Sequence, residues 1–168
     1  MATVTLKGNP FPTIGSLPEI GEAAPDFTLT KNDFSTVTLS DYAGKKLVLN
    51  IFPSVDTGIC AKSVRYFNEK AAGLEDTAVL CISKDLPFAQ NRFCGAEGIE
   101  NVDMLSDFKD GAFGKTYKVT FLEGPFQGLL SRSVVVVDKS GKVAYTEQVG
   151  ETGEEPDYKA AIEAVMNA

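Results

Sequence analysis

Cys60 occupies the position in this sequence that most favours reactive chemistry. An apolar stretch at residues 47–52 leads into the segment PSVDTGIC at residues 53–60, and a helical pattern follows. The thiol is therefore expected at a strand-to-helix turn. The first backbone N–H groups of a helix lack intrahelical partners and carry partial positive charge, so they stabilise an anion there. We predict that Cys60 is a nucleophilic thiolate.

The composition excludes several other kinds of site. The 168 residues include no histidine, which rules out Ser-His-Asp, Cys-His and His-ligated metal sites within this chain. The three cysteines, Cys60, Cys81 and Cys94, are too few for a four-thiolate site. An odd, small number of thiols favours redox or catalytic use over a disulfide framework. We expect no metal and no organic cofactor, and we expect Cys81, inside an apolar run, to be an inert packed thiol.

A lowered thiol pKa alone would give Cys60 little extra rate. A free thiol with a pKa near 8.5 is about 3% ionised at pH 7, and a pKa of ~6 raises that fraction about thirtyfold. A thiolate of lower pKa is also a weaker nucleophile, and this lowers its rate constant roughly tenfold. The net gain in rate is therefore only a few-fold. Fast reaction with a peroxide therefore needs preorganised donors that stabilise charge on the departing oxygen. The Thr57 hydroxyl and the N–H groups of the first helical turn are candidates.

The elements around this turn alternate between strand and helix. Three apolar runs are typical of buried strands, at residues 47–52, 78–82 and 133–137, and a short strand is expected at residues 102–105. Helical spacing begins at Cys60, and further helices are expected near residues 88–97, 108–117 and 156–166. Residues 138–141, DKSG, predict a hairpin turn into a last strand. This order predicts an α/β fold of three layers, a thioredoxin-like arrangement in which helices flank a central mixed β-sheet.

Local signals predict where some of these elements begin. Short strands at residues 3–7 and 37–39, with turns at Asn9-Pro10 and Gly15, indicate an N-terminal β-hairpin with irregular cover. Asp85, shortly before Pro87, is predicted to cap the second helix. Pro156 is predicted to open the last one.

Length and charge narrow the class of protein. A chain of 168 residues fits one domain, residues 1–168, and we find no linker or internal repeat. The net charge of −7 and the lack of a basic stripe argue against nucleic acid and anionic membranes as partners. The first residues have neither a basic nor an apolar signal region, so a cytoplasmic location is expected.

Two segments carry a resemblance to a known family. The pattern Pro53-x-x-x-Thr57-x-x-Cys60 resembles the active-site motif of the peroxiredoxins. The longer blocks NIFPSVDTGIC at residues 50–60 and LPFAQNRFCGAEG at residues 86–98 resemble the bacterial thiol peroxidases, which are atypical two-cysteine peroxiredoxins. The likeness extends through the whole chain, and the second block is specific to that subfamily.

The resemblance implies a thiol-specific peroxidase that acts in antioxidant defence and redox homeostasis. Cys60 would attack hydrogen peroxide or an organic hydroperoxide, and Cys94 would resolve the sulfenic acid as an intrachain Cys60–Cys94 disulfide. Arg132 and Thr57 would organise the transition state, and Pro53 would shield the pocket. The resemblance also implies reduction by thioredoxin and assembly as a homodimer.

Both cysteines fall in expected helices, so the reduced protein need not hold them close enough for a disulfide. We predict that a helix must unwind locally, and that Gly95 and Gly98 make the second helix the easier one to unwind. Asp56 would oppose a neighbouring thiolate, so we expect it to point away and to cap the helix.

Alternative functions remain open from the residues. A thiol–disulfide oxidoreductase is disfavoured because the chain has no C-x-x-C pair. A peroxide-sensing module, in which oxidised Cys60 signals without turnover, is the other candidate. Arg92 either lies near the pocket or pairs with acidic residues. Phe88, Phe93 and Phe126 are expected to pack, with contact to a substrate's organic tail or a second subunit as the lesser alternative.

Overall fold

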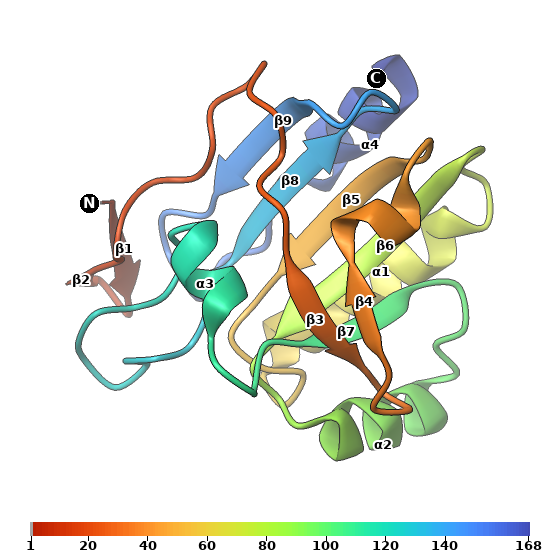
Figure 1. Cartoon of the computed structure of the whole chain (residues 1–168). Coiled ribbons are helices and arrows are strands. Elements are labelled where there is room, and N and C mark those ends of the chain that lie inside the picture. Colours follow the sequence, from red (N-terminus) through yellow and green to blue (C-terminus); the bar gives the residue numbers. More distant parts are fainter. Residues whose placement is uncertain (1) are drawn as a thin grey trace.

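The computed structural model describes residues 2–168, and in this part of the chain a central β-sheet lies between two layers (Figure 1). The sheet has the strand order β4-β3-β7-β6-β5-β8-β9. Its strands are β3 (Thr28–Lys31), β4 (Thr36–Thr38), β5 (Lys46–Ile51), β6 (Thr77–Ser83), β7 (Asp103–Ser106), β8 (Ser133–Val137) and β9 (Val143–Gln148). The apolar runs in the sequence thus form the middle of the sheet.

The sheet is mixed, and its topology gathers several strand ends at one edge. Strands β5, β6 and β7 are parallel, whereas β8 runs antiparallel to β5. The segments that leave β5, β6 and β7 therefore lie at the same edge as the segment that enters β8. This arrangement confirms the predicted α/β, thioredoxin-like fold with a central mixed sheet.

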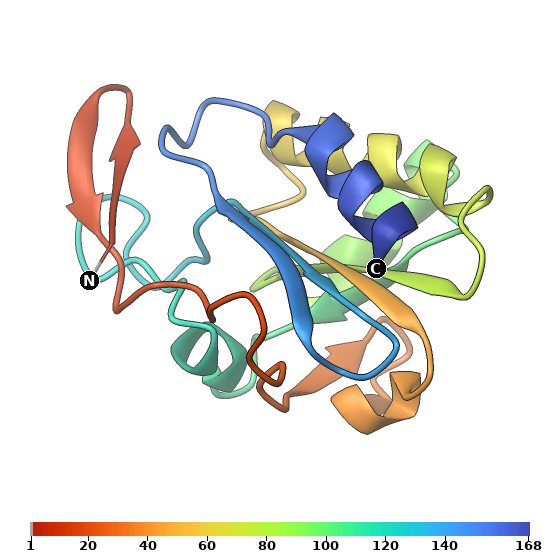
Figure 2. The ribbon, with the colours of Figure 1, turned by 90° about the horizontal axis from the view of Figure 1, so that it is seen from above.

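Figure 2 shows helices on both faces of the sheet. Helices α1 (Gly58–Ala71), α2 (Pro87–Glu97) and α4 (Tyr158–Asn167) pack on one face, where their apolar side chains share a cluster with Val48 and Val134. The short helix α3 (Ala112–Thr116) and a 3-10 turn at Leu39–Tyr42 cover the other face. Each layer has its own apolar core, because successive side chains of a strand point to opposite faces.

The predicted N-terminal β-hairpin is confirmed, but its second strand and its turn differ from the prediction. Strand β1 (Thr3–Leu6) pairs with β2 (Asn9–Pro12), so the turn is at Lys7-Gly8 and not at Asn9-Pro10. Lys7 and Gly8 both have positive φ, 50° and 81°, as a two-residue hairpin turn of this twist requires. Prolines are tolerated in β2 because a two-stranded ribbon has free edges. The strand expected at residues 37–39 is β4, which pairs with β3 in the main sheet.

Three helix starts or lengths also differ from the predictions. Asp85 does not cap α2, because Leu86 is the N-cap residue and Pro87 the first helical residue. A residue before proline favours extended backbone, and Leu86 has φ −64° and ψ 148°. Helix α3 covers only part of residues 108–117. Helix α4 begins after its cap, Asp157, and therefore not at Pro156.

Candidate active site

The register between β5 and β8 brings two distant segments of the chain together. Ile51, the last residue of β5, pairs with Ser133, the first residue of β8. Pro53 follows the end of β5 and Arg132 directly precedes β8, so both lie at the same edge of the sheet. The loop from Pro53 to Thr57 then leads into α1, which carries Cys60 in its first turn.

Thr57 caps the helix that carries Cys60. The Cys60 backbone N–H donates to Thr57 Oγ1 at 3.2 Å, which satisfies one free donor of the first turn. Cys60 is fully buried on the face of α1 that packs on the sheet. The expected capping role of Asp56 is wrong: its carboxylate pairs with Arg92 at 2.9 Å, and both side chains are about two-thirds exposed. Arg92 thus pairs with an acidic residue, one of its two predicted alternatives.

Arg132 places its guanidinium directly on the sulfur of Cys60. Arg132 Nη1 donates to Cys60 Sγ at 3.3 Å, and Nη2 donates to the Thr152 backbone oxygen at 3.0 Å. The side chain is only 2% exposed. Its Nε atom has no hydrogen-bond partner among the described residues. A buried donor without a partner is unfavourable, so the hydrogen bonds of this guanidinium are not completed by the described residues.

Thr152 is a neighbour of Arg132 that was not predicted from the sequence. Its backbone oxygen orients Arg132, and its own N–H and hydroxyl donate to the Thr5 oxygen of β1 at 2.8 and 2.9 Å. The N-terminal hairpin therefore supports the position of Arg132. A contact made through a backbone carbonyl depends on the fold and not on residue type, so no sequence signal marks it.

A pocket of about 190 Å³ opens beside Arg132. It is lined by Leu6, Lys7, Pro53, Thr57, Gly58, Ile59, Phe126, Arg132, Glu151, Thr152 and Gly153. Three predicted site residues, Pro53, Thr57 and Arg132, thus share one pocket, with buried Cys60 in contact with Arg132. Leu6, Ile59 and Phe126 add an apolar wall that the sequence analysis did not assemble.

Cys94 lies in α2. Both Cys94 and Cys60 are free thiols; Cys94 is half-buried and Cys60 is buried. It packs against the same apolar cluster that contains Cys60. Burial raises the pKa of the Cys94 thiol above its usual value, so the neutral form is favoured in this conformation. Two exposed ion pairs connect α2 with α1 and the loop before it, Arg92–Asp56 and Glu97–Arg65. Such exposed pairs are weak restraints on a helix.

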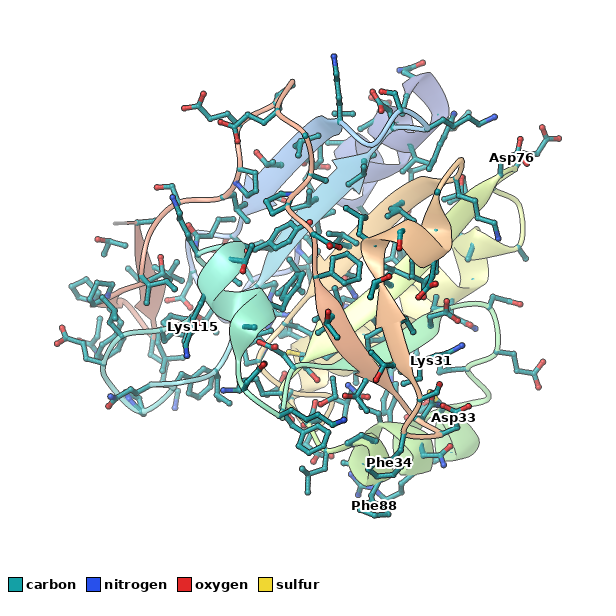
Figure 3. All side chains as sticks on the ribbon, in the orientation of Figure 1. Lys31, Asp33, Phe34, Asp76, Phe88 and Lys115 are labelled. Carbon is teal, nitrogen blue, oxygen red and sulfur yellow. The ribbon has the colours of Figure 1, made fainter. Side chains whose placement is uncertain are left out.

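The remaining predicted residues fall into packed and exposed groups. Cys81 is fully buried in β6, and burial raises its pKa to about 12, which fits an inert thiol. Phe93 is buried, and Phe126 lines the pocket. The packing expected of Phe88 is only partial, because its side chain is 71% exposed and touches Phe34 at a ring-centroid distance of 4.9 Å. Figure 3 shows these two rings together at the tip of the β3–β4 hairpin.

Residues 2–168 contain neither a membrane-spanning helix nor a metal-binding cluster. No helix there combines the length and the apolar character needed to cross a membrane. The same residues bring no three His, Cys, Asp or Glu side chains together in a way that could hold a metal ion. The chemistry that the site can perform is that of a buried sulfur beside a guanidinium, with spare N–H and O–H donors next to a small pocket.

Known proteins that resemble this chain are redoxins, and thiol peroxidases are among them. The redoxin family model matches residues 19–162. The thiol peroxidases of Mycobacterium tuberculosis and of Corynebacterium glutamicum are each 54% identical over 165 residues, which is 98% of this chain and 99% of each relative. These alignments include both segments that carry Cys60 and Cys94.

Solved structures agree with this relationship. A peroxiredoxin-like protein from Aquifex aeolicus has a TM-score of 0.94 and 38% identity, covering 99% of this chain and 97% of that one. A thiol peroxidase from Chromobacterium violaceum shares the fold, with a TM-score of 0.87 at 24% identity over 98% and 95% of the two chains. The chain therefore belongs to the thiol peroxidase family, a group of peroxiredoxin oxidoreductases within the redoxins.

Proposed function

We propose that this protein reduces hydroperoxides through Cys60. The Cys60 thiolate attacks one oxygen of ROOH, the O–O bond breaks, and the second oxygen leaves as ROH after it takes up a proton. The sulfur is oxidised to sulfenic acid and the peroxide is reduced to an alcohol or water. The observation that carries this proposal is the 3.3 Å contact between Arg132 Nη1 and Cys60 Sγ in a buried setting.

A lowered thiol pKa alone gives little rate, so the donors beside the sulfur have to stabilise the charge on the departing oxygen. We assign this role to Arg132, whose Nε is unpaired, and to the Thr57 hydroxyl. That hydroxyl has only a long contact of 3.4 Å to the Ser54 oxygen, so its proton can turn to a substrate oxygen at little cost. Pro53, buried in the pocket wall, limits access of water. Preorganised donors in a low-dielectric site are worth more than the same donors in water.

The wall of the pocket supports organic hydroperoxides as well as hydrogen peroxide. Leu6, Ile59 and Phe126 offer apolar contact to an alkyl or aryl group on the peroxide. Hydrogen peroxide needs only the polar end of the pocket, formed by Thr57 and Arg132. We therefore propose both substrates, with Phe126 as the contact for an organic tail.

We propose that Cys94 is the resolving residue. Its thiolate attacks the sulfenic sulfur of Cys60, a disulfide forms, and water leaves. Because the two cysteines lie on separate helices, α2 must unwind locally before their Cα atoms reach the ~7 Å that a disulfide allows. Unwinding also exposes Cys94, which removes the burial that holds its pKa up. The opened segment thus presents a more reactive thiol.

The catalytic cycle needs electrons from another molecule. Two electrons from an external dithiol would reduce the intrachain disulfide, and we propose thioredoxin as that dithiol, docking where unwound α2 exposes Cys94. We also propose that residues 1–168 act as one domain, that the protein functions in the cytoplasm, and that it forms a homodimer. The exposed pair of Phe34 with Phe88 of α2 offers apolar area to such an assembly.

Two measurements test this proposal: the intact mass of the protein after oxidation, and the amount of peroxide that it consumes. After one equivalent of peroxide, intact wild-type protein should lose two mass units, Cys94→Ser should gain one oxygen, and Cys60→Ser should not change. With thioredoxin, thioredoxin reductase and NADPH, wild type should consume many equivalents of peroxide. Consumption of a single equivalent under these conditions would indicate a sensor and refute the peroxidase proposal.

A further inference from the structure

Asp85 does not cap α2, and its carboxylate accepts hydrogen bonds from the loop that precedes Cys60. Ser54 Oγ donates to Asp85 Oδ1 at 2.7 Å, and the Val55 N–H donates to Asp85 Oδ2 at 2.8 Å. Both donors belong to the loop between β5 and α1. Hydrogen bonds to an ionised carboxylate are shorter and stronger than those between neutral groups. Asp85 is therefore well suited to fix this loop.

Ser54 passes this restraint on to the residues around the sulfur. Its backbone oxygen accepts from the Thr57 N–H at 3.2 Å and from the Thr57 hydroxyl at 3.4 Å. Thr57 in turn accepts from the Cys60 N–H at 3.2 Å. A continuous chain of hydrogen bonds thus runs from Asp85 through Ser54 and Thr57 to the first turn of α1.

The sheet holds Asp85 rigidly from behind. Ser83 Oγ, at the buried end of β6, donates to Asp85 Oδ2 at 2.6 Å, and Ser106 Oγ, at the end of β7, donates to the Asp85 backbone oxygen at 2.5 Å. Strand ends in the middle of a sheet are among the least mobile parts of a fold. Asp85 therefore anchors the Cys60 loop to two central strands, to β6 through its carboxylate and to β7 through its backbone oxygen.

The same group of hydrogen bonds extends into the helix of Cys94. Gln90, fully buried in the first turns of α2, donates from Nε2 to Ser83 Oγ at 3.3 Å and to the Leu105 oxygen at 2.9 Å. Asp85 immediately precedes the N-cap of this helix. One polar cluster thus joins the loop of Cys60, the sheet and the start of α2, while the rest of α2 is outside it.

We propose that Asp85 is a positioning residue for the reaction of Cys60 with peroxide. It does not touch the substrate; it holds Ser54 and Val55 so that the Thr57 hydroxyl and the first turn of α1 face the pocket. Ser54 and Val55 together use both carboxylate oxygens, so an amide in place of the carboxylate keeps an acceptor oxygen for only one of these two donors, and the loop shifts. Small misplacements of reacting groups reduce rates strongly. This inference rests on the proposed peroxidase function.

The experiment isolates the first step in a Cys94→Ser background, where oxidation stops at the Cys60 sulfenic acid. Asp85→Asn is nearly isosteric but puts an NH₂ group where one acceptor oxygen was. We expect the second-order rate constant for Cys60 oxidation, measured by rapid quench and mass spectrometry, to fall roughly 10- to 100-fold. The control is Asp103→Asn, at the opposite end of β7 from Ser106, which removes a carboxylate that accepts from Tyr42 at 2.8 Å and should leave the rate unchanged.

A double-mutant cycle with Ser54→Ala separates positioning from general stability. Because Asp85 acts through Ser54, each single variant should slow oxidation and the double variant should be little slower than Asp85→Asn alone. A purely structural role would lower the melting temperature and give rate effects that add. Ser54→Ala, the milder change, keeps the test decisive if Asp85→Asn folds poorly.

Two results would overturn the inference, and they are distinguishable from failure of the proposed function. Asp85→Asn oxidised at the parent rate, or additive effects with Ser54→Ala, would remove the positioning role while leaving the peroxidase intact. A Cys94→Ser parent that fails to react with peroxide would instead refute the proposed function, and the inference with it.

Discussion

Replacing Gly95 by alanine tests whether α2 must unwind before Cys94 reaches Cys60. Gly95 lies in the exposed interior of α2, and a Cβ atom there would meet nothing within 4 Å. The substitution therefore changes helix stability without changing contacts. Alanine stabilises a helix interior by about 0.8–1.0 kcal/mol relative to glycine. Such a difference lowers the unwound population by about four- to fivefold.

The effect should appear in the second chemical step only. If unwinding is a rapid pre-equilibrium, Gly95→Ala should form the disulfide about four times more slowly, while Cys60 is oxidised at the wild-type rate. Rapid mixing with peroxide, acid quench and intact mass give both rate constants, since sulfenic acid and disulfide differ in mass. The longer-lived sulfenic acid should also be converted more readily to sulfinic acid in excess peroxide.

Two further variants make this result decisive. Ala96→Gly, at the next exposed position, should accelerate disulfide formation by a similar factor, because it destabilises the same helix. Ala164→Gly in α4 should lower overall stability without changing disulfide formation, because that helix carries no cysteine. A Gly95→Ala protein that melts higher but forms its disulfide at the wild-type rate would refute the requirement for unwinding.

Three other predictions concern the site and its supports. Arg132→Lys keeps the charge but loses the fork of N–H donors, so peroxide oxidation of Cys60 should slow roughly 100- to 1,000-fold in rapid-quench assays. The control, Arg65→Lys, should react at the wild-type rate. An Arg132→Lys protein that also reacts at the wild-type rate would show that the guanidinium has no part in the mechanism. Burial raises the pKa of Cys94 in the folded helix, so above a pH of about 8.5 the thiol ionises in the unwound state, and ionisation then favours unwinding. Amide protection in α2, corrected for intrinsic exchange, should therefore fall above that pH in wild type. It should stay constant in Cys94→Ser. Gly114→Ala would press a Cβ against Thr120 and Leu130 and should lower the free energy of unfolding by roughly 1–3 kcal/mol in denaturant titrations, and an unchanged value would show that this part of α3 is loosely packed.

The central fold could be predicted because its signals are strong and local. Strands β5, β6 and β8 are buried on both faces, so their sequences are nearly continuous apolar runs that admit few other interpretations. The turn before Cys60 was predictable for the same reason, since it follows β5 directly. Arg132 needed the family resemblance, because a single arginine before a strand is otherwise ordinary.

The details that escaped prediction depend on competing local rules or distant contacts. Asp85 has the residue type of a helix cap, but Pro87 forces its neighbour Leu86 into extended backbone and into the cap position. The carboxylate is then free to bind Ser54, a partner 31 positions away in the sequence. Asn9-Pro10 has the composition of a turn, yet it forms part of β2, because the Lys7-Gly8 turn sets the hairpin register.

The hairpin formed by β1 and β2 lies outside the segment that defines the redoxin domain, residues 19–162, yet Thr5 holds the loop that orients Arg132. A protein trimmed to these residues would keep all seven strands of the main sheet, Cys60 and Cys94, and would end within α4. It would lose the brace behind its guanidinium. In this chain the residues that match the family model therefore do not include everything that positions the guanidinium.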